Sequence, residues 1–234
     1  MAIPRSRNTV LLVGASRGLG YAMAEEFLHR DWNVVGTVRG VARTRLHELA
    51  EKSAGRVDIE TLDITVPSQI GALRSRLGTR TFAMLFVNAG ITNNPQETIA
   101  DVSTEEFVRV MVTNALSPMR VLEALCDVVA TDGTIGVMSS GQGSVSNNTG
   151  GKREVYRASK AALNTLMRSF AARHVGEPRA MVLMAPGWVR TDMGGSEAPL
   201  TIADSVPNLI NTLLAARGAP GLQYLDYLGR TVPW

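Results

Sequence analysis

Hydrophobic and β-branched residues fall into short runs along the chain, and longer segments of mixed polarity separate these runs. A short run of such residues predicts a strand, whereas apolar positions spaced three or four apart predict an amphipathic helix. The predicted strands are Thr9–Val13, Asn33–Val38, Val57–Leu62, Ala83–Val87, Thr134–Met138, Ala180–Met184 and, more weakly, Leu222–Leu225. The predicted helices are Gly18–Arg30, Ala42–Lys52, Pro67–Leu77, Thr104–Val129 and Val155–His174.

The alternation of strands and helices predicts an α/β fold. Strands that are joined by helices form βαβ units, so the sheet is expected to be mostly parallel with helices on both faces. The segment Phe82–Val87 is apolar at every position, which is typical of a strand that is covered on both sides. No linker or change of composition divides the chain, so residues 1–234 are interpreted as one domain.

Two segments between the predicted elements are expected to be long loops. Gly141–Arg153 is rich in Gly, Ser and Asn, and Met193–Thr201 contains two glycines and a proline. Long loops in a compact domain are often functional, so a lid-like loop is expected at about residues 193–204. The alternative is a tolerated surface insertion. Trp188 and Met193 are candidates for an apolar pocket wall, with a place in the core as the alternative.

Composition excludes several classes of function. The net charge is +3 and the basic residues, mostly arginines, form no dense run, so no nucleic-acid partner is expected. Cys126 is the only cysteine, and His29, His47 and His174 are far apart, so neither a disulfide nor a metal site is expected. No apolar run approaches the roughly 18 residues of a membrane span, and Val10–Val13 is too short for a signal peptide. We therefore expect a cytoplasmic protein.

The first predicted strand leads into a turn that is rich in glycine. The turn consists of Gly14, Ala15, Ser16, Arg17, Gly18, Leu19 and Gly20, and a predicted helix follows it. Glycines let the backbone approach a ligand without a Cβ clash, and the N-terminus of a helix offers free N–H groups to a phosphate. The spacing G-x-x-x-G-x-G differs from the dinucleotide pattern G-x-G-x-x-G. The position between the first strand and the first helix nevertheless predicts a nucleotide phosphate site.

The end of the second predicted strand indicates which nucleotide is bound. An acidic residue there accepts from the ribose 2′-hydroxyl of NAD(H), whereas an arginine accommodates the 2′-phosphate of NADP(H). The strand ends at Arg39 without a nearby carboxylate, and Arg17 adds a second cation in the glycine-rich turn. NADP(H) is therefore predicted, with NAD(H) as the less favoured alternative. The alternative is that Arg39 has no cofactor role and begins the next, solvent-exposed helix.

Polar and small residues end the third and fourth predicted strands. Asp63 and Ile64 follow the third strand, where a carboxylate can accept from the adenine amino group. Asn88, Ala89 and Gly90 end the fourth strand, where open α/β sheets bind ligands. We expect these five residues to contact the cofactor. Each motif is weak alone, because such residues commonly end strands.

Tyr156 and Lys160 are four residues apart on a predicted helix and therefore lie on one face. A free phenol has a pKa of about 10, which is too high for a base at neutral pH. A nearby ammonium group lowers that pKa, so the tyrosine becomes a usable acid for carbonyl reduction or a base for alcohol oxidation. The alternative is a tyrosine packed under a lysine stem on the surface.

Further polar residues are candidates to complete this site. Ser140 follows the strand Thr134–Met138, and its hydroxyl can stabilise charge on a substrate carbonyl oxygen. Asn114 lies inside a predicted helix, four residues before Pro118. A buried asparagine needs hydrogen-bond partners, and proline weakens the helical ladder, so this position can hold a relay water.

The residues after the sixth predicted strand are expected to hold the nicotinamide end of the cofactor. Pro186, Gly187, Val189 and Thr191 lie in this segment, and its backbone groups can bind a carboxamide.

These motifs occur in one order along nearly the whole chain. They are Gly14-x-x-x-Gly18-x-Gly20, Asp63, Asn88-Ala89-Gly90, Asn114, Ser140, Tyr156-x-x-x-Lys160 and Pro186-Gly187. In this combination the chain resembles the short-chain dehydrogenase/reductase family. Further segments are similar to the branch of C-factor-like proteins and sniffer-type carbonyl reductases. These segments are residues 139–150, 156–164, 191–195 and 198–201 and Pro233-Trp234.

The resemblance implies a fold and a reaction. The fold is a Rossmann-like, doubly wound oxidoreductase domain with a seven-stranded sheet of order 3-2-1-4-5-6-7. The reaction is hydride transfer between NADP(H) and a small-molecule carbonyl or alcohol substrate. Relatives are homo-oligomers, so a dimer or tetramer is expected through Thr104–Val129 and Val155–His174.

The resemblance also implies roles for four residues. Tyr156 is the acid/base, Lys160 lowers its pKa and binds the ribose, Ser140 polarises the carbonyl, and Asn114 anchors the relay water. Val13 replaces a threonine that is common in the family, which is a minor departure.

The interval between Ser140 and Tyr156 is about three residues longer than in many members, so Ser139 and Ser144 are alternatives to Ser140. An enzyme is the main hypothesis. A cofactor-binding sensor or signalling protein and an interaction subunit are the rivals.

Overall fold

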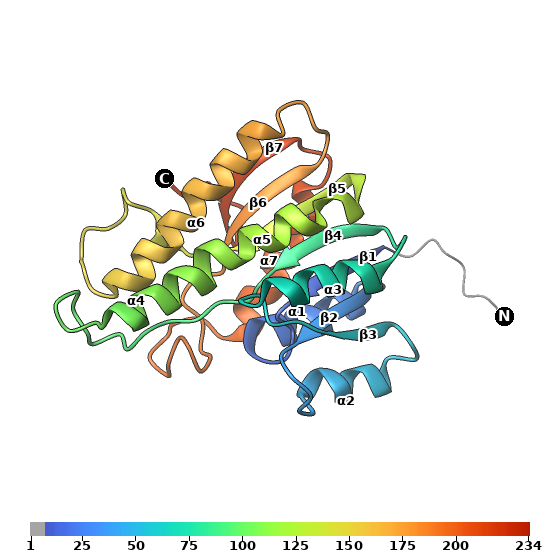
Figure 1. Cartoon of the computed structure of the whole chain (residues 1–234), viewed down its shortest axis with the longest axis horizontal. Coiled ribbons are helices and arrows are strands. Elements are labelled where there is room, and N and C mark those ends of the chain that lie inside the picture. Colours follow the sequence, from blue (N-terminus) through green and yellow to red (C-terminus); the bar gives the residue numbers. More distant parts are fainter. Residues whose placement is uncertain (1–7) are drawn as a thin grey trace.

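Within residues 8–234, which a computed structural model describes, seven strands form one sheet in the order β3-β2-β1-β4-β5-β6-β7 (Figure 1). The strands are β1 (Thr9–Val13), β2 (Asn33–Val38), β3 (Val57–Thr61), β4 (Phe82–Val87), β5 (Val129–Met138), β6 (Ala180–Ala185) and β7 (Gly221–Asp226). All neighbouring strands run parallel. This arrangement confirms the predicted fold class and strand order.

Helices cover both faces of the sheet. They are α1 (Gly18–His29), α2 (Arg45–Lys52), α3 (Pro67–Leu77), α4 (Thr104–Met111), α5 (Ser117–Leu125), α6 (Glu154–Arg173) and α7 (Ile202–Ala216). Three short helical segments are η1 (Val112–Leu116), η2 (Cys126–Val128) and η3 (Gly141–Gly143). Apolar side chains of α3, α5 and α6 form the core on one face, and those of α1, α2 and α7 form the core on the other.

Strand β1 shows why the sheet lies at the centre of the molecule. Side chains alternate between the two faces of a strand. Leu11 and Val13 therefore join the core under α3, α5 and α6, whereas Val10 and Leu12 join the opposite core. All four side chains are inaccessible to solvent. Burial of each stabilises the fold by about 1.5 to 3 kcal/mol, and it fixes the carboxyl end of β1, where the glycine-rich turn begins.

Helix α7 corrects the sequence analysis, which predicts no helix between the sixth and seventh strands. The helix begins inside the segment expected to be a lid, because Thr201 and Asp204 form a capping box. Pro207 lies inside the helix and removes one backbone donor. The helix persists because it buries Leu209 and Leu213 against the sheet.

The helix predicted at Thr104–Val129 is also different in the structure. It consists of α4, a π-helical segment η1 and α5, and the N–H of Ser117 bonds to the carbonyl of Val112. The wider turn occurs directly before Pro118, whose ring cannot continue a regular ladder. Strand β5 then begins at Val129, five residues earlier than the prediction.

Candidate active site

The glycine-rich turn after β1 is held by residues at the ends of the neighbouring strands β2 and β4. The N–H of Gly14 donates to Oγ1 of Thr37 at 3.0 Å, and the N–H of Ala15 donates to the Thr37 carbonyl at 2.9 Å. The carbonyl of Gly14 accepts from Nδ2 of Asn88 at 2.8 Å. The turn is thus fixed to the ends of β2 and β4. Thr37, which the sequence analysis does not single out, is one of its two anchors.

Two glycines of the turn have no room for a side chain. A Cβ on Gly20 would lie 2.0 Å from the carbonyl oxygen of Gly14, and a Cβ on Gly14 would lie 2.9 Å from Ala89. Gly18 differs, because its φ is +55° and no atom lies within 4 Å of its Cβ position. The turn is therefore tight on the protein side and open on the side where a ligand would approach.

The N-terminus of α1 suits a phosphate. Its N-cap residue, Arg17, makes no side-chain capping bond, and its first turn contains no acidic residue. The N–H groups and the positive end of the helix dipole are therefore available to an anion. The guanidinium of Arg17 bonds to Asp192 at 2.5 Å, and both side chains are exposed. This part of the site fits a dinucleotide.

Arg39 and Asp63 lie at the ends of β2 and β3. The Asp63 carboxylate accepts from the hydroxyl and the N–H of Thr65 at 2.6 and 2.9 Å. The hydroxyl of Thr65, its N–H and the positive charge of Arg39 lower the pKa of Asp63. Arg39 is exposed, whereas Ile64 is buried. The two charged residues that are predicted to bind the nucleotide thus share one edge of the sheet, next to the glycine-rich turn.

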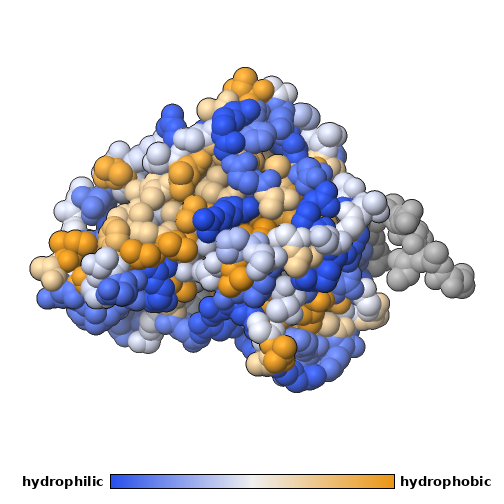
Figure 2. All heavy atoms as spheres, in the orientation of Figure 1, coloured by the Kyte–Doolittle hydropathy of each residue, from blue (hydrophilic) through white to orange (hydrophobic). Residues whose placement is uncertain are grey.

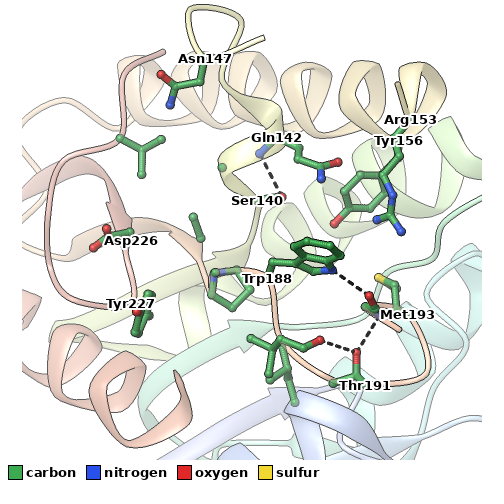
Figure 3. Close-up of a pocket in the computed structure, with 18 of the residues that line it drawn as sticks. Ser140, Gln142, Asn147, Arg153, Tyr156, Trp188, Thr191, Met193, Asp226 and Tyr227 are labelled. Atoms are coloured by element: carbon green, nitrogen blue, oxygen red, sulfur yellow. Dashed lines mark hydrogen bonds between the residues drawn. The ribbon is translucent and has the colours of Figure 1, made fainter. Parts of the chain in front are cut away.

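Tyr156 lines a cavity of about 400 Å³ at the carboxyl ends of β5, β6 and β7. Figure 3 shows its hydroxyl pointing into the cavity, near Ser140 and Trp188. Burial raises the pKa of Tyr156, whereas its hydrogen bond with Ser140 and the positive charge of Arg153 lower it. The phenol is therefore a proton donor at neutral pH, with Ser140 as its hydrogen-bonding neighbour.

Lys160 lies one turn further along α6 and is 3% exposed. Its Nζ donates to the Met138 carbonyl at 2.9 Å and lies 5.8 Å from the centre of the Tyr156 ring. Burial lowers the pKa of Lys160 to about 8. The positive charge that lowers the pKa of Tyr156 belongs to Arg153, and the expected role of Lys160 in lowering that pKa stays a prediction.

The three candidate serines have different surroundings. The Oγ of Ser139 donates to Asn164 at 2.6 Å, and that of Ser144 donates to the Trp234 carbonyl at 3.2 Å; both residues are buried. Ser140 instead lines the cavity and hydrogen-bonds with Tyr156. The geometry favours Ser140 over both alternatives.

Asn114 lies in the π-helical segment and is fully buried. Its Oδ1 accepts from the N–H of Ile91 at 2.8 Å, and its Nδ2 donates to the Ile91 carbonyl and to Ser159 at 2.8 and 3.0 Å. A Cβ on Gly90 would lie 3.3 Å from Oδ1 of Asn114 and 3.5 Å from Nζ of Lys160. The absence of a side chain at Gly90 thus leaves room beside both polar atoms.

The segment after β6 forms another wall of the same cavity. Pro186, Gly187, Val189 and Thr191 all line it, and so does Leu19 from the glycine-rich turn. The loop is held by its own hydrogen bonds, among them that from the Trp188 indole N–H to the carbonyl of Gly194 at 2.8 Å (Figure 3). The structure therefore brings the predicted cofactor turn and the predicted catalytic tyrosine to one cavity.

Several polar cavity residues are missed by the sequence analysis. They are Gln142, Asn147, Arg153, Asp226, Tyr227 and Arg230. Three of them, Gln142, Asn147 and Arg153, belong to the predicted Gly141–Arg153 loop. Only the length of this loop indicates from the sequence that its residues have a function. The other three follow the weakly predicted last strand, and no local pattern indicates that this region returns to the site.

Comparison with known proteins identifies the family. The short chain dehydrogenase model matches residues 8–199, and the chain therefore belongs to the short-chain dehydrogenases. The chain is 36% identical to C-signal of Myxococcus xanthus over 138 residues, which are 58% of this chain and 83% of that protein. Among residues 8–234, no helix has the length and apolar character needed to cross a membrane.

Solved structures agree with this family. A Burkholderia multivorans chain described as a short-chain dehydrogenase/reductase, solved with bound NADP, is 63% identical, with a TM-score of 0.96 over 97% of this chain and 100% of that chain. A carbonyl reductase of Pseudomonas aeruginosa PAO1 in complex with NADP is 35% identical, with a TM-score of 0.91 over 98% and 100% of the two chains. Together with C-signal, they confirm the predicted family resemblance.

Proposed function

We propose that this chain is an NADP(H)-dependent oxidoreductase that reduces a carbonyl group, or oxidises the corresponding alcohol, with Tyr156 as the acid/base. The observation that carries this proposal is the shared cavity: Leu19 from the glycine-rich turn, Ser140 and Tyr156 all line it. A cofactor held by the turn would therefore reach the same space as the tyrosine hydroxyl. The two NADP-bound relatives support the choice of cofactor.

The described residues support a division of roles toward the cofactor. The uncapped N-terminus of α1 and Gly18 would bind phosphate, and Arg39 would pair with the 2′-phosphate. Lys160 would donate to the nicotinamide ribose, because its Nζ is buried and already oriented by the Met138 carbonyl. When bound, NADPH supplies the hydride.

The remaining roles concern the proton and the carbonyl oxygen. Tyr156 would donate its phenolic proton to the substrate oxygen, while the hydroxyl of Ser140 stabilises the charge that develops there. Asn114 retains a second lone pair on Oδ1, and both this atom and Nζ of Lys160 lie next to Gly90; this geometry supports the role of Asn114 in anchoring a relay water.

A panel of aldehydes, ketones and quinones tests this function through the oxidation of NADPH by the wild-type chain. We expect turnover with at least one class and a lower KM for NADPH than for NADH. Tight NADPH binding without turnover of any substrate would instead favour a sensor, the alternative that the similarity to C-signal supports. Absence of NADPH binding would reject both functions.

We also propose that two or more copies of the chain associate through α4, α5 and α6. We further propose that the protein is cytoplasmic. Figure 2 shows apolar side chains gathered where α5 and α6 lie in Figure 1. Val108 on α4, Leu116 at the end of η1 and Leu166 on α6 are 49%, 39% and 40% exposed. Light scattering measures the assembly, and Leu166→Glu is expected to shift it toward the monomer. A wild-type chain that is monomeric at micromolar concentration would reject this interface.

A further inference from the structure

The cavity next to Tyr156 contains one positive charge that no carboxylate of the described chain neutralises. Three charged residues line the cavity: Arg153, Asp226 and Arg230. Asp226 accepts from Nε of Arg230 at 2.7 Å and from two backbone N–H groups, so these two residues compensate each other. The guanidinium of Arg153 has no hydrogen bond or ion pair with any residue from 8 to 234.

The backbone directs Arg153 toward the cavity at a conformational cost. Gly151, Lys152 and Arg153 have φ values of +60°, +58° and +54°, a left-handed conformation that favours glycine. The neighbouring Glu154 points elsewhere, because its carboxylate accepts from the N–H of Ile99 at 2.7 Å. An arginine thus lies at a position where the backbone conformation favours glycine, and its guanidinium is unpaired within residues 8–234. Such strain is typical of functional sites.

A second unpaired group lies in the same cavity. Oε1 of Gln142 is buried and accepts no hydrogen bond within the part of the chain that the structure describes. Buried polar atoms are rarely without a partner, so this acceptor indicates a hydrogen-bond donor, such as a water or a hydroxyl group of the ligand. In Figure 3, Gln142 and Arg153 lie on either side of the Tyr156 ring. A substrate that reaches the tyrosine hydroxyl would therefore lie within range of both side chains.

Taking the proposed carbonyl reduction as its basis, we infer that Arg153 binds a carboxylate on the substrate, so that the preferred substrates are carbonyl compounds that carry a carboxylate. A single uncompensated cation matches a monoanion. The planar guanidinium also presents paired N–H donors that fit the two carboxylate oxygens. Trp188 and Met193 also line the cavity and would contact the apolar body of the substrate.

Matched pairs of aldehydes test this specificity. The probes are 3- and 4-formylbenzoate and their methyl esters, which carry the same carbonyl group with and without the negative charge. With NADPH and the wild-type chain, we expect kcat/KM for the better carboxylate to exceed that for its ester by at least about 10-fold, mainly through KM. Equal values for acid and ester would overturn the inference.

Three variants separate binding from structure. Arg153→Gly removes a charge that also acts on Tyr156, an effect common to both substrates, so we expect the ratio of kcat/KM for the carboxylate to that for the ester to fall at least about 10-fold. The variant should keep its melting temperature, because glycine suits this backbone. Arg153→Lys should retain part of the preference. Lys152→Gly removes a positive charge from the same left-handed segment, but this exposed residue does not line the cavity, so it should leave both substrates unaffected. Equal losses for acid and ester in Arg153→Gly would contradict the inference.

A binding measurement keeps this test independent of the proposed reaction. The probe is benzoate, titrated calorimetrically into the NADP⁺ complex of each variant. We expect its Kd to rise at least about 10-fold in Arg153→Gly and to stay constant in Lys152→Gly. Unchanged benzoate affinity in Arg153→Gly would refute the role of Arg153. Failure to reduce either aldehyde, with this difference in benzoate affinity intact, would refute the reductase function alone.

Discussion

The glycine-rich turn and the rim of the cavity around Arg153 lie at two ends of one site, yet their polar groups are satisfied differently. In the turn, the N–H and carbonyl of Gly14 both bond to side chains that neighbouring strands fix. Around the cavity, the Arg153 guanidinium and Oε1 of Gln142 have no partner among residues 8–234. Lys160, one helical turn from Tyr156, is a buried cation. The polar groups of Gly14 are therefore satisfied within the protein, whereas groups around the cavity are left free for a ligand at a cost in stability.

The largest expected effect on cofactor binding comes from breaking the turn with Gly20→Ala. The new Cβ would lie 2.0 Å from the carbonyl oxygen of Gly14 and 2.6 Å from Nδ2 of Asn88, so the turn must shift. We expect the Kd for NADPH, measured by fluorescence titration, to rise at least about 100-fold, roughly 2.7 kcal/mol. Gly71→Ala in α3 is the control, because no atom lies within 4 Å of its Cβ position. NADPH affinity in Gly20→Ala equal to that of the wild type would show that the turn is not the phosphate site.

The next effect concerns the stability cost of burying the charged side chain of Lys160. Burial lowers the pKa of Lys160 to about 8, against about 10.4 in an unfolded chain. The unfolded chain therefore binds more protons between about pH 8 and 10, and the free energy of unfolding rises with pH in that window. At neutral pH the buried charge costs about 3 kcal/mol, which the bond to the Met138 carbonyl partly offsets.

Lys160→Met removes this buried charge. We expect the variant to lose turnover but to be more stable than the wild type by about 1 to 3 kcal/mol at pH 7, with the gain shrinking toward pH 10. Urea unfolding at several pH values measures the difference. Lys52→Met, at an exposed position of α2, should show no such gain. A less stable Lys160→Met at pH 7 would mean that the buried ammonium is held by interactions stronger than its desolvation.

A smaller effect is expected on the preference for NADPH over NADH, at the end of the site that would bind the nucleotide. Arg39→Asp replaces the exposed cation at the end of β2 with a group that repels a 2′-phosphate and accepts from a ribose hydroxyl. The ratio of kcat/KM for NADPH to that for NADH is expected to fall by about 10- to 100-fold. Arg43→Ala is a matched control nearby, since this guanidinium already makes two 2.8 Å bonds to Glu51. A ratio that Arg39→Asp leaves unchanged would assign the cofactor preference to other residues.

The same comparison explains what the sequence predicts well. Strand β1 and the turn after it depend on neighbours in the chain: four apolar residues followed by glycines at fixed positions. The local sequence pattern therefore predicts both the strand and the turn. Tyr156 and Lys160 are equally local, being one helical turn apart on α6. Their chemistry is less local, because the pKa of Tyr156 depends on Ser140 and Arg153.

The features that the sequence does not predict depend on distant contacts. Helix α7 contains Pro207, which argues against a helix, although the capping box at Thr201 and Asp204 is a signal that indicates its start. Asn114, in the π-helical segment, bonds to Ile91 and Ser159, which lie 23 and 45 residues away in the chain. Whether a loop arginine lines a cavity is likewise decided only when the chain has folded.

The most direct test of the central claim is the turnover of Tyr156→Phe, measured together with its NADPH affinity. The phenyl ring keeps the packing of the buried side chain and removes only the hydroxyl that points into the cavity. We predict that NADPH oxidation with a substrate of the wild type falls at least about 1,000-fold, within the 10² to 10⁴ range of acid–base catalysis, while the Kd for NADPH changes less than about 3-fold. Turnover that survives in Tyr156→Phe would contradict the assignment of Tyr156 as the proton donor.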